Sequence, residues 1–382
     1  MGDDLAGVRP QAPVVRVGLI VNPVAGLGGA AGLKGSDGAD VQREALARGA
    51  IARAGERAAV AVRALLAARP DATVVTVPGA MGESSVRAAG AVPELVACAP
   101  GEPSSSADTR AGVRALAAVD LLLFAGGDGT ARDVLDAGPT APVLGIPAGV
   151  KVYSGCFAVG PAAAGLAAAE FTGDTAEAEV VDLDEQAYRE GRVSPRLYGT
   201  LTVPAARVRL SGRKTGSSGA APETVEGIAR EVVARMRPGV RYILGPGTTT
   251  RAVGRALGAR STLLGVDVVA DGVPIGVDLS ERALLDLVDG HEVEAVVSVI
   301  GGQGFVLGRG NQQISPSVLA RVHGLTVLAT RTKLAALGGR PLLADTGDPA
   351  TDARLSGFVK VVTGYRESVP YRIVPASEEC SG

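Results

Sequence analysis

Short apolar runs alternate with longer helical segments through the first 150 residues of the chain. The apolar runs predict strands at residues 14–21, 73–77, 95–98, 121–125 and 143–146. Continuous apolar strands of this kind are typical of a sheet that is covered on both faces. Helices are predicted between them at residues 40–68, at 109–118 and from Ala131. The alternation predicts an open, doubly wound parallel sheet, a Rossmann-like α/β fold, over about residues 14–150.

The pattern changes after Pro161, where the apolar runs become shorter. Strands are predicted at residues 180–183, 198–203, 207–210, 242–244, 263–269, 325–329 and 358–362, and helices at 162–171, 222–236 and up to Leu257. Residues 212–221 are rich in glycine and serine and predict a flexible loop. Its Arg213 and Lys214 either reach a phosphate group or are simply solvated. The second half of the chain is therefore expected to be rich in short strands.

Composition narrows the class of protein. The 382 residues carry a net charge of -2, which argues against a nucleic-acid surface. Cys98, Cys156 and Cys380 lack CxxC spacing and suggest free thiols in a reducing compartment. The first residues have no apolar h-region of a signal peptide, and no apolar run approaches the ~20 residues of a membrane span. We therefore expect a cytoplasmic protein without a membrane or nucleic-acid partner.

The stretch around residues 119–136 carries the strongest chemical signal. A buried strand runs into Gly126, Gly127, Asp128, Gly129 and Thr130, and a helix follows. The glycines let the backbone approach a ligand, and the helix N-terminus favours a phosphate. A carboxylate beside a phosphate can hold a metal ion, bind a ribose hydroxyl or accept a proton from it. The alternative is an ordinary strand-to-helix turn with an Asp/Thr cap.

Two other loops follow predicted strands of the same sheet. The first contains Asn22 and a run of glycines that suits a phosphate. Its candidate residues are Gly26, Gly28, Gly29, Lys34 and Asp37. Lys34 could contact a phosphate and Asp37 a metal or a hydroxyl, or the loop is a mobile surface loop with incidental charges. Its glycines do not make a dinucleotide fingerprint, because the acidic strand end expected about 20 residues later is missing. The second loop, at residues 147–155, contains Gly149 and Lys151. Lys151 is the candidate for a cation that offsets charge on a phosphoryl group, or else it is a surface lysine.

The second half offers two further candidate sites. Gly247, Thr248 and Thr249 stand at a strand-to-helix junction, which again suits an anion. Asp267 lies within an apolar strand, either as a ligand to a hydroxyl or metal or as a buried structural residue. In residues 296–315, the side-chain amides of Gln303, Asn311 and Gln312 can recognise a base or a ribose, or they form the polar tips of a hairpin.

Several stretches resemble a known family. GGDGT after an apolar strand is similar to the signature of NAD kinases, diacylglycerol and sphingosine kinases, and phosphofructokinases. The stretches NPVAGLGGAAGLKGSDG, IPAGVKVYSGCFAVGP and GGQGFVLGRGNQQISP resemble the ATP-NAD kinase / acetoin-catabolism protein X family over about residues 17–316. GPGTTT resembles the TPTGSTAY stretch of NAD kinases. The resemblance implies an N-terminal Rossmann-like domain at residues 14–155, a C-terminal β-rich domain at 156–330, and an extension at 331–382 that packs back on the N-terminal domain.

The resemblance also implies a reaction. An ATP-dependent kinase of this kind transfers a phosphoryl group to a hydroxyl, here the 2′-hydroxyl of the adenosine ribose of NAD. Asp128 takes the role of the base and Lys151 that of the cation, while the glycine loops hold the phosphates. Mg²⁺ is expected on the phosphates, with no protein ligand assigned other than Asp128 as a candidate. A homodimer or homotetramer is the expected assembly.

One feature departs from the family, since the chain contains no Asn-Glu dipeptide, the pair with which NAD kinases bind the second ribose. The acceptor alternatives are therefore a polyol, a nucleoside or a secondary-metabolite intermediate. A lipid kinase would need an apolar or basic membrane-facing surface. A nucleotide-binding regulator without catalysis is the alternative of a different class. Hydrolase and zinc chemistry are not indicated, because the two histidines, His291 and His323, lie away from the glycine loops.

Overall fold

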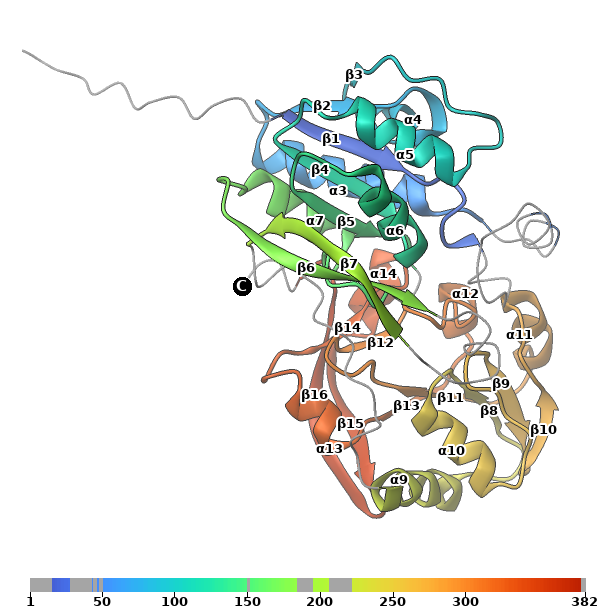
Figure 1. The fold of residues 1–382 in the computed structure, drawn as a ribbon. Coiled ribbons are helices and arrows are strands. Elements are labelled where there is room, and N and C mark those ends of the chain that lie inside the picture. Colours follow the sequence, from blue (N-terminus) through green and yellow to red (C-terminus); the bar gives the residue numbers. More distant parts are fainter. Residues whose placement is uncertain are drawn as a thin grey trace, which may run out of the picture.

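The computed structural model describes residues 16–27, 43, 47, 51–149, 152–183, 195–205 and 222–378. In this part of the chain, five parallel strands form the N-terminal sheet in the order β3-β2-β1-β4-β5 (Figure 1). The strands are β1 (Arg16–Val21), β2 (Thr73–Thr76), β3 (Glu94–Leu95), β4 (Leu121–Gly126) and β5 (Val143–Pro147). The strand order reverses direction between β1 and β4, which is where open α/β sheets bind ligands.

Helices cover both faces of this sheet, as the predicted doubly wound fold requires. On one face α3 (Ala54–Ala68) packs against α7 (Pro161–Ala169), and on the other α5 (Ser106–Ala115) packs against α6 (Asp128–Ala137). Helix α4 (Glu83–Ala88) follows β2 and the short turn η1 (Gly79–Met81), and lies beside α3. The predicted N-terminal Rossmann-like sheet is confirmed.

The prediction of one continuous helix over residues 40–68 is wrong. Residues 51–53 are not helical, and α3 begins at Ala54. Arg53 immediately precedes the helix, and its guanidinium donates to the Thr346 carbonyl in the second half of the chain. A tertiary contact therefore coincides with this helix start, and helical periodicity alone does not register it.

An antiparallel ribbon extends the N-terminal unit beyond residue 155. It consists of β6 (Thr175–Leu183) and β7 (Pro195–Pro204), and it packs on α6 and β5. The Tyr198 hydroxyl donates to the Asp136 carboxylate at 2.9 Å. Gly199 lies against Leu135, where a Cβ would stand 2.6 Å from that side chain. Both strands are longer than predicted, because their alternating polar positions hide them from a search for apolar runs.

The second half of the chain folds around a mixed sheet in the described residues, with the order β10-β9-β8-β11-β13-β15-β16-β14-β12. Its strands are β8 (Arg241–Leu244), β9 (Asp267–Ala270), β10 (Val273–Gly276), β11 (Val293–Ser298), β12 (Phe305–Leu307), β13 (Gly324–Leu328), β14 (Leu342–Ala344), β15 (Gly357–Gly364) and β16 (Glu367–Pro375). The neighbours β8, β11 and β13 are parallel, whereas β15 and β16 form an antiparallel hairpin. The prediction of a strand-rich second domain is confirmed.

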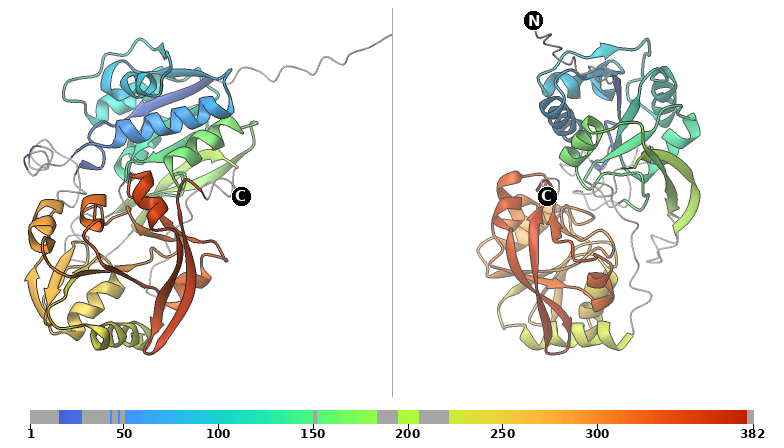
Figure 2. Two further views of the ribbon diagram at one scale, coloured as in Figure 1. Left: turned by 180° about the vertical axis from the view of Figure 1, so that it is seen from behind. Right: turned by 90° about the vertical axis from the view of Figure 1, so that its left-hand side faces the viewer.

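Helices also cover both faces of this second sheet. Apolar side chains of α9 (Pro222–Arg235) and α10 (Thr248–Ala256) pack on one face. The opposite face is covered by α11 (Glu281–Val288), α12 (Pro316–Leu319) and α13 (Arg331–Ala335). The segment after residue 331 contributes β14, β15 and β16 to the sheet, and α14 (Pro349–Arg354) leads into β15. Figure 1 shows β14 and α14 on the side that faces the N-terminal unit, and the red helix α14 lies on that side in the two views of Figure 2.

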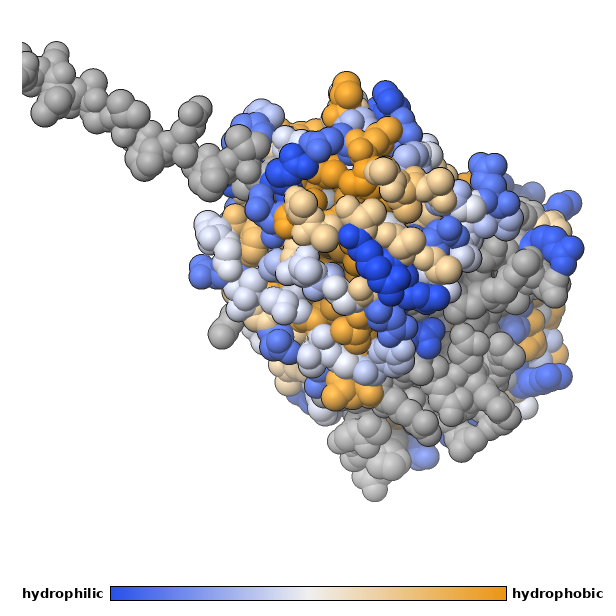
Figure 3. Space-filling view, turned by 45° about the horizontal axis from the view of Figure 1, so that its top comes forward, coloured by the Kyte–Doolittle hydropathy of each residue, from blue (hydrophilic) through white to orange (hydrophobic). Residues whose placement is uncertain are grey.

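Among the described residues, every helix is too short or too polar to span a bilayer. Over the N-terminal unit, apolar and charged residues are interspersed on the face shown in Figure 3. Cys98 and Cys156 are free thiols, as predicted, and Cys380 lies outside the described residues.

A buried ionic cluster joins the two units. The Arg57 guanidinium of α3 lies 2.5 Å from the Asp345 carboxylate, and Arg309 approaches the same oxygen at 2.7 Å. Burial works to raise the pKa of Asp345, but the two arginines outweigh it and hold that pKa below its usual value. Burial lowers the pKa of Arg309 to about 10, so it stays charged at neutral pH. Removing one partner would leave an unpaired buried charge, which is costly.

We predict that Asp345→Asn destabilises the protein by about 3–5 kcal/mol, because both arginines lose their carboxylate inside the interface. Urea unfolding measures the change. Glu367→Gln serves as the matched control, since the Arg331–Glu367 pair is exposed and contributes at most about 1 kcal/mol. Equal effects of the two substitutions would contradict the assignment.

Candidate functional site

Loops that follow β1, β4 and β5 meet where the strand order reverses. The Asn22 amide nitrogen, just after β1, donates to the Thr130 hydroxyl of α6 at 3.1 Å. The backbone N–H of Ala148, just after β5, donates to the Gly126 carbonyl at 3.0 Å. Gly26 has a φ of 84° and lies so close to the Ala148 carbonyl that a Cβ would stand 2.6 Å from its oxygen. The predicted phosphate-binding positions Asn22, Gly26, Gly126 and Thr130 therefore come together at one edge of the sheet.

The GGDGT junction is tighter than predicted, because α6 begins at Asp128 and not at Ala131. Gly127 is the residue before the helix and has an extended backbone. Gly126 faces Thr130, where a Cβ would stand 2.2 Å from the hydroxyl oxygen. A carboxylate in the first turn is favoured by the helix dipole, which explains the earlier start. The free N–H groups of this first turn are also where a phosphate would bind.

The Asp128 carboxylate is partly buried and held by the loop after β5. Its oxygens accept hydrogen bonds from the backbone N–H of Tyr153 at 2.8 Å and of Ser154 at 2.9 Å, and from the Ser154 hydroxyl at 2.6 Å. These described donors use three of the roughly four acceptor positions of a carboxylate. Burial raises the pKa of Asp128 above its usual value, while the Ser154 and Tyr153 hydrogen bonds work to lower it. A carboxylate with a raised pKa and one remaining acceptor position suits a general base.

Side chains from the C-terminal unit hold the same loop. The Gln303 amide, between β11 and β12, donates to the Val152 carbonyl at 2.9 Å. The Gln312 amide donates to the Gly149 carbonyl. Gly149 itself has a φ of 91°. The two amides therefore bind the loop at the carbonyls of Gly149 and Val152, which flank residues 150 and 151 in the sequence.

Some predicted residues cannot be placed. Lys151 follows Gly149 in sequence by two positions, but it lies outside the described residues. The same holds for the remaining candidates of the first glycine loop and for the basic pair of the second domain: Gly28, Gly29, Lys34, Asp37, Arg213 and Lys214. Their roles stay predictions.

The junction before α10 lies at the carboxyl end of β8. Gly247 precedes the helix with a φ of 138°, and Thr248 is its first residue. Thr249 is buried, and its hydroxyl lies 3.3 Å from the Lys333 ammonium, which is also buried. No sequence pattern pointed to Lys333, because it stands in a short polar helix far along the chain. The anion-binding role of Gly247, Thr248 and Thr249 stays a prediction.

The remaining recognition candidates have contacts within the protein. The Asp267 carboxylate accepts from the Thr262 N–H at 2.6 Å and the Asp278 N–H at 2.9 Å. Asn311 donates to the Val306 carbonyl at 2.9 Å. These contacts give both side chains a structural use, and their predicted role in substrate recognition is untested.

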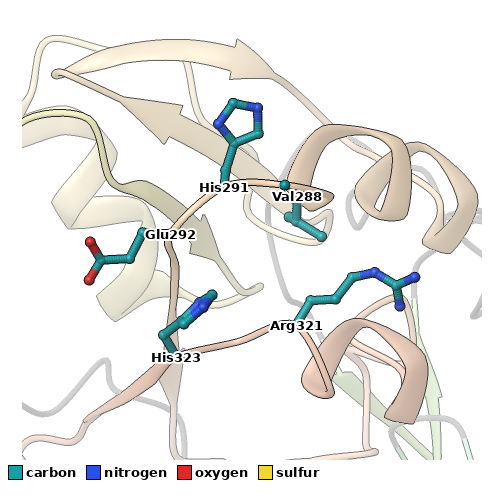
Figure 4. Close-up of a pocket in the computed structure, with 6 residues that line it drawn as sticks. Val288, His291, Glu292, Arg321 and His323 are labelled. Carbon is teal, nitrogen blue, oxygen red and sulfur yellow. The ribbon is translucent and has the colours of Figure 1, made fainter.

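A separate hollow of about 440 Å³ lies at the opposite, amino-terminal edge of the second sheet. It is lined by Val288, Gly290, His291, Glu292, Arg321 and His323. Figure 4 shows the side chains of His291, Glu292 and Arg321 pointing in different directions. Glu292 pairs with Arg237 at 2.6 Å, and His323 accepts from the Val293 N–H at 3.2 Å. The described contacts of His323 and Glu292 are structural, and the labelled side chains do not converge on one point.

The described residues contain no group of three or more His, Cys, Asp or Glu side chains that could hold a metal ion. Mg²⁺ usually keeps several waters and binds through substrate phosphates with one or two carboxylates.

Comparison with known families agrees with this geometry. The sequence model of the ATP-NAD kinase N-terminal domain matches residues 17–175, and that of the ATP-NAD kinase C-terminal domain matches residues 237–373. No match was found among curated proteins or among solved structures. The two matched ranges cover more than half of the chain. They contain the GGDGT junction, the loop that binds Asp128, and Gln303 and Gln312, whose side-chain amides bind that loop. The chain therefore belongs to the ATP-NAD kinase family, and it is a phosphotransferase that acts on a hydroxyl group.

Proposed function

We propose that this protein transfers the γ-phosphoryl group of ATP to the 2′-hydroxyl of the adenosine ribose of NAD, giving NADP. The observation that carries the proposal is the Asp128 carboxylate, which lies at the N-terminus of α6 where the loops after β1, β4 and β5 meet. A carboxylate beside a phosphate site repels the bound phosphate, so its presence there calls for a chemical role. We assign it the role of accepting the proton of the attacking hydroxyl.

The chain's residues divide the task between binding and proton transfer. The first turn of α6 and the glycine loops present N–H groups to the phosphates, and Asn22 fixes Thr130 beside them. Asp128 orients the acceptor hydroxyl through its remaining acceptor position and takes its proton as the new P–O bond forms. In this proposal Lys151, two residues beyond Gly149 in the sequence, supplies the cation that offsets charge on the transferred group. Phosphoryl transfer depends mainly on such positioning and charge neutralisation.

Mg²⁺ fits this donor set as a phosphate-bound ion. The described residues offer no cluster of acidic, histidine or cysteine ligands, and three of the acceptor positions of Asp128 are already occupied. Loops rich in backbone donors hold a nucleotide whose phosphates carry the ion. When bound, Mg²⁺ supplies charge neutralisation on the phosphate oxygens.

A second acceptor class has specific support. The chain contains two asparagines, Asn22 and Asn311, and neither is followed by glutamate. Both side chains are hydrogen-bonded within the protein, to Thr130 and to Val306. The Asn-Glu pair with which NAD kinases bind the second ribose is therefore missing. The runner-up function is phosphorylation of another small hydroxylated metabolite, such as a polyol or a nucleoside, at the same site.

We predict that Asp128→Asn and Asp128→Ala lower kcat by about 10²–10⁴-fold while the fold is retained, because the base is lost. ADP release measures the rate, and circular dichroism checks the fold. Asp136→Asn, in the last turn of the same helix, is the matched control and keeps near-normal turnover. Near-normal turnover of both Asp128 variants would remove Asp128 from the mechanism.

The pH profile follows from the state of Asp128. The base works only when ionised, so activity falls as the pH drops through its pKa, which burial raises. Ser154→Ala removes the donor that most lowers this pKa, and we predict that the acid limb of kcat moves to higher pH. Ser85→Ala, at another buried serine of the same unit, leaves the limb in place. A limb that is insensitive to Ser154→Ala would exclude Asp128 as the titrating group.

Donor and acceptor are tested by one screen. We predict ADP formation from ATP with NAD in the presence of Mg²⁺, loss of activity with EDTA, and recovery on adding Mg²⁺. NADH, nucleosides, polyols and polyphosphate complete the panel. Turnover with a polyol or nucleoside but not with NAD would favour the runner-up acceptor. No ADP release with any acceptor would indicate a nucleotide-binding regulator.

A further inference from the structure

One peptide group stands between the two units of the protein. Its carbonyl belongs to Val152 and accepts the Gln303 amide at 2.9 Å. Its N–H belongs to Tyr153 and donates to the Asp128 carboxylate at 2.8 Å. Gln303 and Asp128 are therefore joined by a single planar unit, with one hydrogen bond at each end.

We propose that Gln303 is a positioning residue for the reaction: from the C-terminal unit, it orients the 152–153 peptide so that its N–H holds Asp128. This role rests on the proposed function, in which Asp128 is the base. It also gives Gln303 a use other than the recognition of a base or ribose.

The Gln303 side chain is well placed for such a role. It is 3% exposed, and it projects from a tight turn in which its own N–H donates to the Ile300 carbonyl at 3.2 Å. Gly302 and Gly304 on either side have φ values of 79° and 84°, which favour glycine. Arg340 donates to the Gly302 carbonyl at 3.0 Å and fixes the turn from outside. A donor held this rigidly loses little conformational entropy on binding the loop.

The effect on Asp128 has a definite sign. A donor on a peptide carbonyl polarises the peptide and strengthens the hydrogen bond that its N–H donates. A stronger hydrogen bond to a carboxylate favours the ionised form. The Gln303 contact of the C-terminal unit therefore favours the ionised form of Asp128 and fixes the orientation of its carboxylate. Asp128 has its full set of supporting contacts only when both units are in place.

Other charged and titratable groups lie near Asp128 in the described residues. Arg132, further along α6, favours the ionised form of Asp128, and the buried Cys156 thiol lies close enough to sense its charge. On the neighbouring elements, Arg110 of α5 is paired with Asp133 at 2.8 Å. Lys151 is outside the described residues. A second variant that disturbs the same loop is therefore needed to separate a change passed through the 152–153 peptide from a general shift of the loop.

Gln312 provides the matched control. It donates the same kind of amide from the same unit to the same loop, but to the carbonyl of Gly149. Among the described residues, the loop atoms that donate to Asp128 belong to Tyr153 and Ser154, and the Gly149 carbonyl is not part of either peptide group. If the two glutamines only dock the units together, their loss has the same effect on Asp128.

The test is a titration of Asp128 by carbon-13 NMR of labelled aspartate carboxyls, with the Asp128 signal assigned by its loss in Asp128→Asn. We expect Gln303→Met to move the Asp128 transition to higher pH and Gln312→Met to leave it at the wild-type position. In the kinase assay, Gln303→Met lowers kcat by about tenfold, with little change in the KM for ATP. Gln303→Asn, with a shorter amide, moves the transition in the same direction and replaces Gln303→Met if that variant does not fold.

The proposal is overturned if the Asp128 transition is unmoved by Gln303 variants, or if Gln312→Met moves it equally. The NMR titration needs no turnover, so its outcome is independent of the substrate. Absence of phosphoryl transfer by the wild type would overturn the proposed function, and the titration would still decide the role of Gln303.

Discussion

The contact between the Asp128 carboxylate and the backbone of Tyr153 and Ser154 is the constraint on which the site depends. A carboxylate at this depth needs hydrogen-bond donors, and β4 and α6 alone do not supply them. The loop after β5 does, and it is thereby fixed against the GGDGT junction. Asn22, just after β1, adds a third contact by donating its amide N–H to the Thr130 hydroxyl of α6. Three strand ends that are far apart in sequence are joined into one rigid edge.

The C-terminal unit completes this arrangement by gripping the loop from the other side. Gln303 and Gln312 hydrogen-bond to two of its carbonyls, and two arginines of the ionic cluster, Arg57 and Arg309, bind carbonyls on either side of it. Arg57 donates to the Pro147 carbonyl at 2.5 Å, and Arg309 donates to the Val159 carbonyl at 2.8 Å. Since these carbonyls bracket the loop, the ionic cluster that joins the two units also sets the ends of the segment that binds Asp128. Interface stability and site geometry are therefore coupled in this protein.

The sequence was informative where function requires particular residues close together along the chain. An apolar strand followed by GGDGT predicts both the sheet edge and Asp128, and the glycine loops after β1 and β5 follow the same logic. It was uninformative where a partner comes from elsewhere. Gln303 and Val152 are far apart in sequence, and no spacing rule connects them. The same holds for Arg57 and Asp345, while short elements such as α12 and β14 bury too few residues to show a period.

A crystal structure with Mg²⁺, a non-hydrolysable ATP analogue and NAD would show whether Asp128 takes the proton of the acceptor hydroxyl. We expect the ribose 2′-hydroxyl within about 3 Å of an Asp128 oxygen and in line with the γ-phosphate. We also expect the Tyr153 and Ser154 hydrogen bonds to Asp128 to be retained. An acceptor hydroxyl bound away from Asp128, with another residue of the chain at its proton, would contradict this role of Asp128.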